Sequence, residues 1–438
     1  MQTTECTLID LPNENNINNG YFTSFVDEIR KSNKLIVQPR MGFGTVEEMQ
    51  SGLKKVKYAC APTIGTLTID SYTRVNQYDA AKRALDSGHK LNGFPIVTHG
   101  SETTRSMLDG LMTKYFPVQV RHGTALPKEI FKALLNSGLD ATEGGPISYC
   151  LPYSRVPLEK ATQAWAECSQ LFAEATAQGR LCHLESFAGC MLGQLCPPSL
   201  LIALTVLECL FFRSHGVKSV SLSLAQGTNS KQDLAALLVL RRLAKEYLND
   251  VNWHVVVYTY MGVFPETTKG AFDILSESAR IAALSGCERL IVKTPAEAHR
   301  IPTIDENVAS LEMAFVVSQD ARTQAFSIDQ EEQEKLYEEA NFLIEMVMGL
   351  HTNLDVALNI AFKKGYLDVP YCLHQDNANL SRCYIDTQGY LKWASIGKIP
   401  FPDYLSDNKH QSHQVSSQEL LNMLQFNKNK YDGEGYDN

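Results

Sequence analysis

The segment from Ala141 to Tyr153 gathers side chains that could bind a small polar ligand. Its functional groups are one carboxylate, two adjacent glycines and two phenols: Glu143, Gly144, Gly145, Tyr149 and Tyr153. Three arginines lie upstream, and each ends or closely follows an apolar, strand-like run: Arg40, Arg74 and Arg121. Three cations, one anion and two hydroxyl groups together match a ligand with two carboxylates and one ammonium group. The pattern therefore predicts a site for an amino dicarboxylate.

The arginines are informative because of both their chemistry and their placement. A guanidinium holds a carboxylate through two donors at a fixed orientation, which a flexible lysine does not. If the strand-like runs belong to a parallel barrel, their carboxyl ends meet at one mouth, and the arginines converge there. The alternative is structural: a single arginine more often forms an ion pair, and the glycines could serve a tight turn with positive φ angles while the tyrosines simply pack.

Lys293 follows the apolar run 290–292, which would place its amine at the same mouth. Read alone, it could be a Schiff-base lysine. The next residues, Thr294 to Glu297, have the pattern of a capping box, so local chemistry assigns Glu297 a structural role. Residues 303–306 repeat this pattern and predict the start of another helix.

Short apolar runs alternate with helical patterns over most of the chain, as in βα units around a parallel sheet. Nine strands are predicted, of which 139–143 has the weakest pattern: 34–40, 65–71, 91–98, 117–122, 139–143, 181–187, 217–225, 252–260 and 289–293. Helices are predicted over 102–115 after a cap at Ser101, and over 128–136, 160–178, 233–248 and 270–284. The predicted fold is α/β, a (β/α)8 TIM-type barrel. A doubly wound sheet is the alternative, but no Gly-x-Gly-x-x-Gly follows a predicted strand.

The pattern along the chain suggests four regions. Residues 1–33 form an N-terminal extension, and 34–317 form the barrel. A charged helix over about 329–348 and an irregular region then make 318–425 a helical and irregular C-terminal appendage. Residues 426–438 are polar and contain glycine, so they are expected to be a disordered tail.

The composition excludes several classes of function. The 438 residues carry a net charge of −9 and no lysine- or arginine-rich run, so nucleic acid is not an expected partner. The 11 cysteines contain no C-x-x-C pair, which fits a reducing compartment better than a disulfide framework or a zinc site. No signal peptide is apparent, and the longest apolar run, from Leu200 to Phe212, is short and interrupted by Glu208. A cytoplasmic protein without membrane spans is expected.

Other catalytic motifs give no support to competing chemistry. His99, His122 and His183 lack the spacing of metal ligands, so no metal site is expected. The chain has neither a G-x-S-x-G nucleophile elbow nor a G-x-x-x-x-G-K-[ST] phosphate loop. Hydrolase and nucleoside-triphosphatase functions are therefore not expected.

A set of ordered motifs resembles a known family. The segments QPRMG, TIDSYTR, LNGFP, VRHGT, TEGGPISYCLPY, CPPS, MGVFP and VKTPAEAHRIPT are similar, in order and spacing, to the large (epsilon) catalytic subunit of adenosylcobalamin-dependent glutamate mutase, also called methylaspartate mutase. The resemblance runs from about Lys34 to Pro402. It implies an isomerase that interconverts L-glutamate and (2S,3S)-3-methylaspartate through an adenosyl radical.

The resemblance also implies roles for individual residues. Substrate-binding residues would be Arg40, Arg74, Arg121, Glu143, Tyr149 and Tyr153, of which Glu143 and Arg74 are expected to take part in catalysis. Asn92 and Phe187 fall on pocket positions, and Lys293 and Glu297 match residues that contact the adenosine ribose, so all four are expected at the cofactor. This match favours a cofactor contact over an imine at Lys293, and it gives the carboxylate of Glu297 a second role.

The family resemblance further implies a separate small subunit that carries Asp-x-His-x-x-Gly and holds the cobalamin, because this chain lacks that motif. The expected assembly is a homodimer of this subunit within a heterotetramer. The chain departs from the family pattern at Thr98, at Pro146 and at Tyr258-Thr259-Tyr260. In place of these last three residues, the family pattern commonly has His-Gln-Trp. A lyase or aldolase that uses Lys293, and a non-catalytic partner-binding subunit, remain the alternatives.

Overall fold

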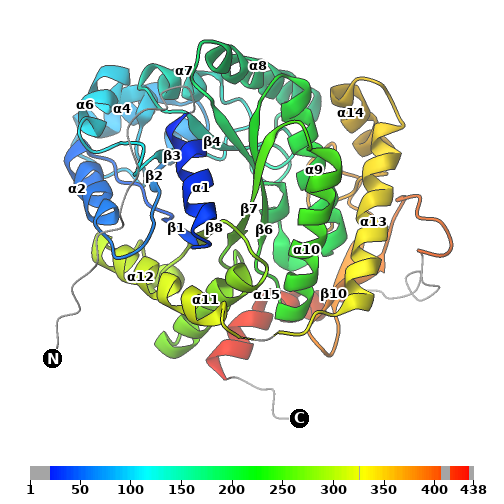
Figure 1. The fold of residues 1–438 in the computed structure, drawn as a ribbon. Helices are drawn as coiled ribbons and strands as arrows, with labels where there is room; N and C mark the ends of the chain where they lie inside the picture. The colour runs from blue at the N-terminus through cyan, green and yellow to red at the C-terminus, as the bar shows by residue number, and fades with distance from the viewer. Residues whose placement is uncertain (1–19, 325, 406–414, 434–438) are drawn as a thin grey trace.

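Eight parallel strands form a barrel whose helices lie on the outside (Figure 1). In this computed structural model, residues 20–324, 326–405 and 415–433 are described, apart from the side chain of residue 194. The barrel strands are β1 (Ile36–Pro39), β2 (Gly65–Thr68), β3 (Val118–Arg121), β4 (Ala141–Gly144), β5 (His183–Ser186), β6 (Ser219–Ala225), β7 (Asn252–Tyr258) and β8 (Arg289–Val292). Strands β1 and β8 pair in register, and a parallel bridge between Val37 and Thr63 links β1 to the segment before β2. The predicted TIM-type fold is confirmed.

Helices connect the strands and continue into the C-terminal region. Those that precede or accompany the barrel are α1 (Tyr21–Lys31), α2 (Val46–Lys57), α3 (Ser71–Arg74), α4 (Tyr78–Asp86), α5 (Ile96–His99), α6 (Ser101–Leu108), α7 (Lys128–Asn136), α8 (Leu158–Ala177), α9 (Pro198–Ser214), α10 (Ser230–Tyr247), α11 (Thr268–Leu284) and α12 (Ile304–Ala321), with the short 3₁₀ turns η1 (Ala188–Cys190), η2 (Gly193–Leu195) and η3 (Pro295–Ala298). Beyond them lie α13 (Gln330–Met348), α14 (Leu354–Lys364), the antiparallel pair β9 (Arg382–Ile385) and β10 (Leu391–Ser395), and α15 (Ser417–Asp432).

Helix α1 covers the amino-terminal end of the barrel. The Phe22 ring stacks on the His183 imidazole, at a centroid distance of 4.6 Å, and the Thr23 hydroxyl lies 2.9 Å from the Ser219 hydroxyl. Both partners are the first residues of their strands. The carboxylate of Asp140 accepts a hydrogen bond from the Phe22 amide, which gives the first turn of α1 an acceptor that Gly20 has no side chain to supply. The floor of the barrel is therefore closed to solvent by buried side chains.

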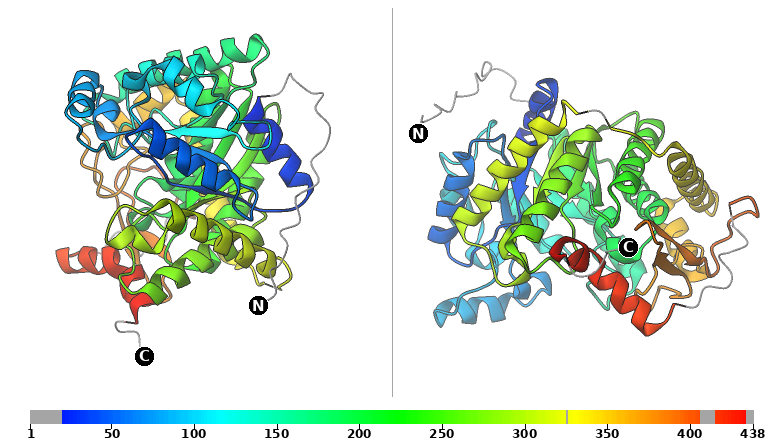
Figure 2. Two further views of the ribbon diagram at one scale, coloured as in Figure 1. Left: turned by 90° about the vertical axis from the view of Figure 1, so that its left-hand side faces the viewer. Right: turned by 90° about the horizontal axis from the view of Figure 1, so that it is seen from below.

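The region after the barrel packs along one side of it. Helix α13 lies against α9 and α10, and α14 contacts α8 and α9, as Figures 1 and 2 show on the flank beside α9. The apolar run from Leu200 to Phe212 forms α9, which is buried from Pro198 to Phe212 between the barrel and α13. None of the helices in the described residues is long and apolar enough to cross a membrane.

Two strand predictions had opposite outcomes. The weakest, 139–143, is confirmed as β4. The prediction of a strand over 91–98 is wrong: Phe94 makes one strand-like bond to the Thr68 carbonyl, but Pro95 has no amide hydrogen and α5 begins at Ile96. Nine candidates thus reduce to the eight strands of the barrel.

Two helix boundaries also differ from expectation. The helix predicted over 102–115 ends at Leu108, because Gly110 takes a positive φ of 67° and turns the chain. Ser101 is not the N-cap, since its hydroxyl donates to the Ala133 carbonyl. The expectation of disorder from 426 is wrong as far as Asp432, because these residues complete α15; residues 434–438 lie outside the described part.

Candidate active site

Several of the predicted site residues meet at the carboxyl ends of the barrel strands. Arg121 ends β3, Glu143 lies in β4, and Arg40 and Lys293 directly follow β1 and β8. Parallel strands in a barrel end at one mouth, and side chains two residues apart along a strand share a face. The shared mouth explains why residues far apart in the sequence become neighbours.

The centre of the site is a buried ion pair between Arg121 and Glu143. The Nε atom of Arg121 donates to Oε2 of Glu143 over 2.7 Å, and the side chains are only 6 % and 2 % exposed. The Nη1 atom of Arg121 is also buried, yet it has no hydrogen-bond partner among the described residues. A buried guanidinium donor without an acceptor is costly, so this atom is positioned to bind an anionic ligand.

The Glu143 carboxylate has two further donors. The Tyr149 hydroxyl donates to Oε1, and the Tyr258 hydroxyl lies 2.6 Å from Oε2. Burial raises the pKa of Glu143, but the charge of Arg121 and the three hydrogen bonds outweigh it and hold the pKa below its ordinary value. Burial and the neighbouring Glu143 raise the pKa of the Tyr149 phenol well above its ordinary value. Glu143 is therefore an anion whose neighbours are neutral hydroxyls and one guanidinium.

The paired glycines after Glu143 serve the packing of the protein itself. Gly144 has a φ of 131°, and a β-carbon there would lie 2.4 Å from the Tyr149 ring. A β-carbon on Gly145 would lie 2.1 Å from the carboxylate of Glu208. The positive φ of Gly144 fits the structural alternative, and protein atoms fill the positions that β-carbons on both glycines would need.

Glu208 holds the loop that follows the glycines. From the middle of α9, its carboxylate accepts bonds from the amides of Ile147 and Ser148, at 3.0 and 2.8 Å, and from the hydroxyls of Ser148 and Ser186. Burial raises its pKa to about 7. In the sequence, Glu208 was predicted only as a charge that interrupts an apolar run; its position within that run was the available signal for a buried anchor.

Aromatic rings line the side of the site next to Glu143. Phe187, which directly follows β5, is 3 % exposed and lies 5.3 Å from the Tyr149 ring and 5.4 Å from the Tyr258 ring, centroid to centroid. Tyr153 lies at the outer edge of this group and is 51 % exposed. Tyr149 is thus a buried partner of Glu143, whereas Tyr153 is available at the surface of the mouth.

A second charged group lies at the β1 and β8 side of the mouth. The Lys293 Nζ atom is 2.9 Å from Oε1 of Glu297, and Arg40 approaches the same oxygen at 3.5 Å. Burial, with the charges of Arg40 and Arg121, lowers the pKa of Lys293 to about 8 despite the opposing effect of Glu297. Burial raises the pKa of Glu297, but Lys293 and Arg40 outweigh it and lower the pKa overall.

The capping-box predictions divide. At 303–306 the box is confirmed, with both reciprocal bonds between Thr303 and Glu306 present. At 294–297 the Thr294 hydroxyl accepts from the Ala296 amide at the start of the short turn η3, whereas the Glu297 side chain pairs with Lys293 and Arg40. Glu297 is therefore free of a capping role and belongs to the mouth.

Arg74 and Asn92 lie farther out on the same side. Arg74 ends the short helix α3 after β2, is exposed, and its Nε donates to the Ile69 carbonyl at 3.3 Å. Its side chain passes beside Gly123, two residues after Arg121. The Asn92 side chain accepts bonds from the amide and hydroxyl of Ser71. The structure thus places both residues in the connection between β2 and β3, next to the site and without direct contact to Glu143.

A polar layer fills the barrel directly beneath the site. Arg289 is fully buried and bonds Glu185, His254 and, through Nη1 at 2.6 Å, Gln38. Gln38 in turn bonds Gln119 at 2.8 Å. Neither this layer nor the contact of Tyr258 with it was predicted from the sequence. The available signal was the spacing along the strands, because side chains two or four residues apart point to the same face. Each polar residue of the layer stands two or four positions before a site residue: Gln38 before Arg40, Gln119 before Arg121, Glu185 before Phe187 and Arg289 before Lys293.

The histidines considered as metal ligands have separate local partners. His99 lies 2.9 Å from the Gly44 carbonyl, His122 accepts from the Thr124 amide through Nδ1, and His183 bonds Ser219 and Ser221. Burial lowers the pKa of His122 to about 3, so this residue is neutral.

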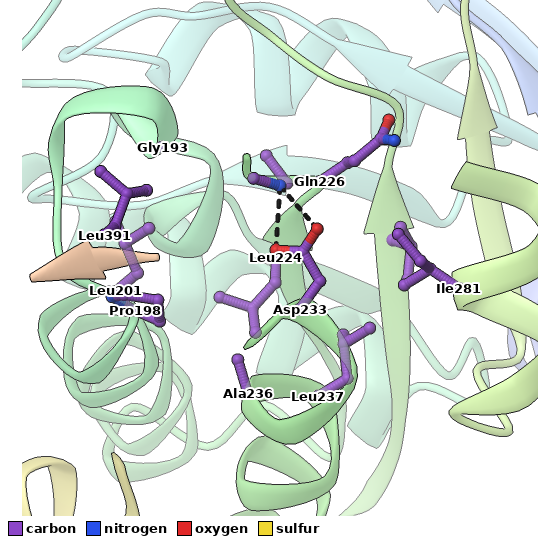
Figure 3. Close-up of a pocket in the computed structure, with 13 residues that line it drawn as sticks. Gly193, Pro198, Leu201, Leu224, Gln226, Asp233, Ala236, Leu237, Ile281 and Leu391 are labelled. Atoms are coloured by element: carbon purple, nitrogen blue, oxygen red, sulfur yellow. Dashed lines mark hydrogen bonds between the residues drawn. The ribbon is translucent and has the colours of Figure 1, made fainter. Parts of the chain in front are cut away.

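A small cavity lies elsewhere, outside the barrel wall (Figure 3). It measures about 20 Å³, lies between β6, β7 and helices α9 to α11, and is lined mostly by apolar side chains. Its one carboxylate, Asp233, accepts two bonds from the Gly227 amide. This volume holds about one water molecule, so the cavity is no candidate for the amino dicarboxylate.

Comparison with known proteins identifies relatives that share most of the chain. The profile of the family "Methylaspartate mutase E chain (MutE)" matches residues 17–420. The glutamate mutase epsilon subunit of Escherichia coli O157:H7 is 33% identical over 397 residues, which cover 87% of this chain and 81% of the relative. The corresponding subunit of Yersinia enterocolitica is 32% identical over 88% of this chain and 83% of its own, and that of Haloarcula marismortui is 33% identical over 87% and 80%. The chain therefore belongs to the methylaspartate mutase E chain family.

Proposed function

We propose that this chain is the catalytic subunit of a carbon-skeleton mutase that interconverts L-glutamate and (2S,3S)-3-methylaspartate. Family membership supports the reaction, since the relatives are glutamate mutase epsilon subunits. The observation that carries the substrate class is the buried pair of Arg121 and Glu143, in which one guanidinium nitrogen has no partner among the residues that the structure describes. An anion site and a cation site side by side fit an amino acid.

The residues of the mouth divide the substrate between them. Arg121 binds one carboxylate through its Nη edge while its Nε atom stays on Glu143. The Glu143 carboxylate accepts hydrogen bonds from the substrate ammonium, and the Tyr149 hydroxyl orients this carboxylate by donating to its Oε1 atom. Arg40 and Arg74, both partly or wholly accessible, bind the carboxylates from the outer side, together with the Tyr153 hydroxyl. Fixed donors at both ends keep the fragments in place while a carbon group migrates, which lowers the entropic cost of recombination.

The donor set at the β8 side fits the adenosine of adenosylcobalamin. The Glu297 carboxylate is an acceptor for ribose hydroxyls, and Lys293 is a donor held beside it. Phe187 offers an apolar face, and Asn92 offers an amide on the neighbouring loop. When bound, this cofactor supplies homolysis of a cobalt–carbon bond and thereby the radical that abstracts a substrate hydrogen. The protein's contribution is orientation and electrostatics.

Exclusion of water is the second contribution of this chain. The polar layer around Arg289 is fully bonded within the protein, and α1 closes the floor beneath it. Reactive species in the mouth are thus protected from solvent on the side of the barrel interior. The mouth itself, at the carboxyl ends of the strands, needs a separate cover.

A small cobalamin-binding subunit with Asp-x-His-x-x-Gly is the proposed cover. The name "epsilon subunit" of the relatives implies a multi-subunit enzyme. Large apolar side chains are exposed in the connections that follow β2, β4 and β7: Tyr72, Val75, Tyr153 and Val263. Their location around the mouth supports an interface there. The heterotetramer built on a homodimer of this chain, and the cytoplasmic location, are further proposals.

Reconstitution tests the proposal. Methylaspartate formation from L-glutamate is assayed with adenosylcobalamin and the purified chain, with and without the small subunit. We expect turnover only with both proteins. Turnover by this chain alone refutes the two-component assignment, and a stable complex without turnover favours the non-catalytic alternative.

A lyase that forms an imine is the second candidate, and it is favoured by the lowered pKa of Lys293, about 8. Borohydride reduction with a 2-oxo dicarboxylate distinguishes it. A covalent adduct on Lys293 supports the lyase, whereas its absence in a preparation that forms methylaspartate supports the mutase.

A further inference from the structure

Tyr258 lies where the carboxylate of Glu143 meets the polar layer beneath it. It ends β7 and is fully buried. Its hydroxyl is 2.6 Å from Oε2 of Glu143 and also within hydrogen-bonding distance of Oε1 of Glu185. The Cζ atom of Arg121 lies 5.0 Å from the centre of its ring. The side chain therefore contacts both members of the central ion pair.

The two glutamates that share this hydroxyl are direct neighbours across the sheet. Glu143 of β4 pairs in register with Glu185 of β5, and both side chains point into the barrel. Like charges at directly opposed positions destabilise a sheet, and burial strengthens the repulsion. Arg121 pairs with Glu143 and Arg289 pairs with Glu185, so each arginine compensates one of the two carboxylates. The group between them is the Tyr258 hydroxyl.

The phenol is suited to this place because it remains a donor. Burial, together with Glu143 and Glu185, raises the pKa of Tyr258 well above its ordinary value. Without the hydroxyl, two buried carboxylate oxygens would face each other with no proton between them. Glu143 would then turn away from its present position or take up a proton, and either change weakens its contact to a cation.

We propose that Tyr258 is a positioning residue for the amino group of the substrate: its hydroxyl separates Glu143 from Glu185 and keeps the Glu143 carboxylate charged and aimed into the mouth. This inference rests on the proposed function, because it takes Glu143 as the ligand of the substrate ammonium. It assigns a role to a residue that the family resemblance marks only as a departure of this chain.

The test compares two ligands that differ in the amino group. L-glutamate and glutarate share two carboxylates, but glutarate has no ammonium, so the ratio of their dissociation constants reports the Glu143 contact. Calorimetric titrations use the full chain with the small subunit and without adenosylcobalamin, so that no turnover occurs. We expect Tyr258→Phe to reduce the preference for L-glutamate about tenfold or more while glutarate binding stays within about twofold of wild type.

Tyr260→Phe is the matched control. Tyr260 follows the same strand, is also fully buried, and its hydroxyl has no partner among the described residues. Its removal should leave the ratio unchanged. Tyr258→His, which restores a ring with an N–H donor, should recover part of the preference. In the assembled enzyme, Tyr258→Phe should raise the KM for glutamate more than it lowers kcat.

The outcomes separate this inference from the proposed function. If the wild-type enzyme forms methylaspartate but Tyr258→Phe retains the full preference for L-glutamate, the role of Tyr258 is refuted and the function stands. Equal weakening of both ligands also refutes it, because that result describes general damage to the pocket. If the wild-type protein binds neither ligand, both proposals fail.

Discussion

Arg121 binds Glu143 through the Nε atom alone, over 2.7 Å, and leaves a buried Nη1 atom without a partner in the described part of the chain. One guanidinium can therefore hold an internal carboxylate and an incoming one at the same time. The planar group fixes the angle between the two contacts. This relationship places the proposed ammonium and carboxylate sites next to each other on the same guanidinium.

Arg121→Lys should lower turnover about tenfold or more, equivalent to about 1.4 kcal/mol of transition-state stabilisation. An ammonium on a flexible stem keeps the charge but cannot hold Glu143 and a substrate carboxylate in one plane. Steady-state kinetics of the reconstituted enzyme measure the effect, and circular dichroism checks that the variant is folded. Wild-type kinetics from a folded Arg121→Lys protein would refute the carboxylate assignment.

Glu143→Gln should leave a folded protein with impaired catalysis. The amide oxygen can still accept from Arg121 or Tyr258, and the amide nitrogen can donate to the Tyr149 hydroxyl, so the local geometry is retained. The charge that compensates Arg121 is lost, and a modest fall in the melting temperature is expected. Turnover and thermal melting are compared with wild type. Unchanged activity and unchanged melting together would favour a merely structural role for Glu143.

Gly145→Ala should destabilise the protein by about 1–3 kcal/mol or more, because its β-carbon would overlap the carboxylate of Glu208. Glu208 must then release the Ile147 and Ser148 amides, and Tyr149 moves with the loop. Gly193→Ala is the matched control, since its β-carbon would meet the nearest atom at 3.4 Å. Thermal melting and turnover should both fall for Gly145→Ala. Equal melting temperatures for the two variants would contradict the proposed overlap.

The sequence allowed the barrel and most of its mouth to be predicted because both depend on short-range patterns. Apolar runs marked every strand of the barrel, although not the pair β9 and β10, and the arginines at or beyond the strand ends followed from parallel topology. The strand expected over 91–98 does not form because Pro95 has no amide hydrogen for a strand ladder and helix α5 begins at Ile96. The end of α15 was missed because tertiary contacts stabilise it: the Asp432 carboxylate accepts from the amides of Glu266 and Thr267.

The residues that support the site were harder to predict than those that form it. Glu208, in helix α9, holds the loop after Glu143 from 65 positions along the chain. Tyr258, in strand β7, contacts Glu143 from 115 positions away. No spacing rule connects such positions. The register of neighbouring strands connects them, as the pairing of Glu143 with Glu185 shows, and register depends on the closed barrel. The roles of the individual site residues remain predictions.

The stability of the Lys293→Met variant should depend on pH in a specific direction. Burial lowers the pKa of Lys293 from 10.5 to about 8, so below pH 8 both the folded and the unfolded chain carry the charge, and the folded state bears the cost of burying it. Between pH 8 and 10.5 the unfolded chain binds more protons than the folded one, and the wild-type protein gains stability as pH rises. The Lys293→Met variant lacks this pH dependence of stability, because methionine does not titrate. Calorimetric melting should therefore show Lys293→Met to be more stable than wild type by more than about 1 kcal/mol at pH 7, with a difference that shrinks toward pH 10.

The control is Lys269→Met, at a side chain that is 86% exposed, which should show no such trend. If Lys293→Met is less stable than wild type at pH 7, the ion pair with Glu297 outweighs the cost of burial. If it is more stable but inactive after reconstitution, the lysine is retained at the expense of stability, as expected for a residue that serves the cofactor site.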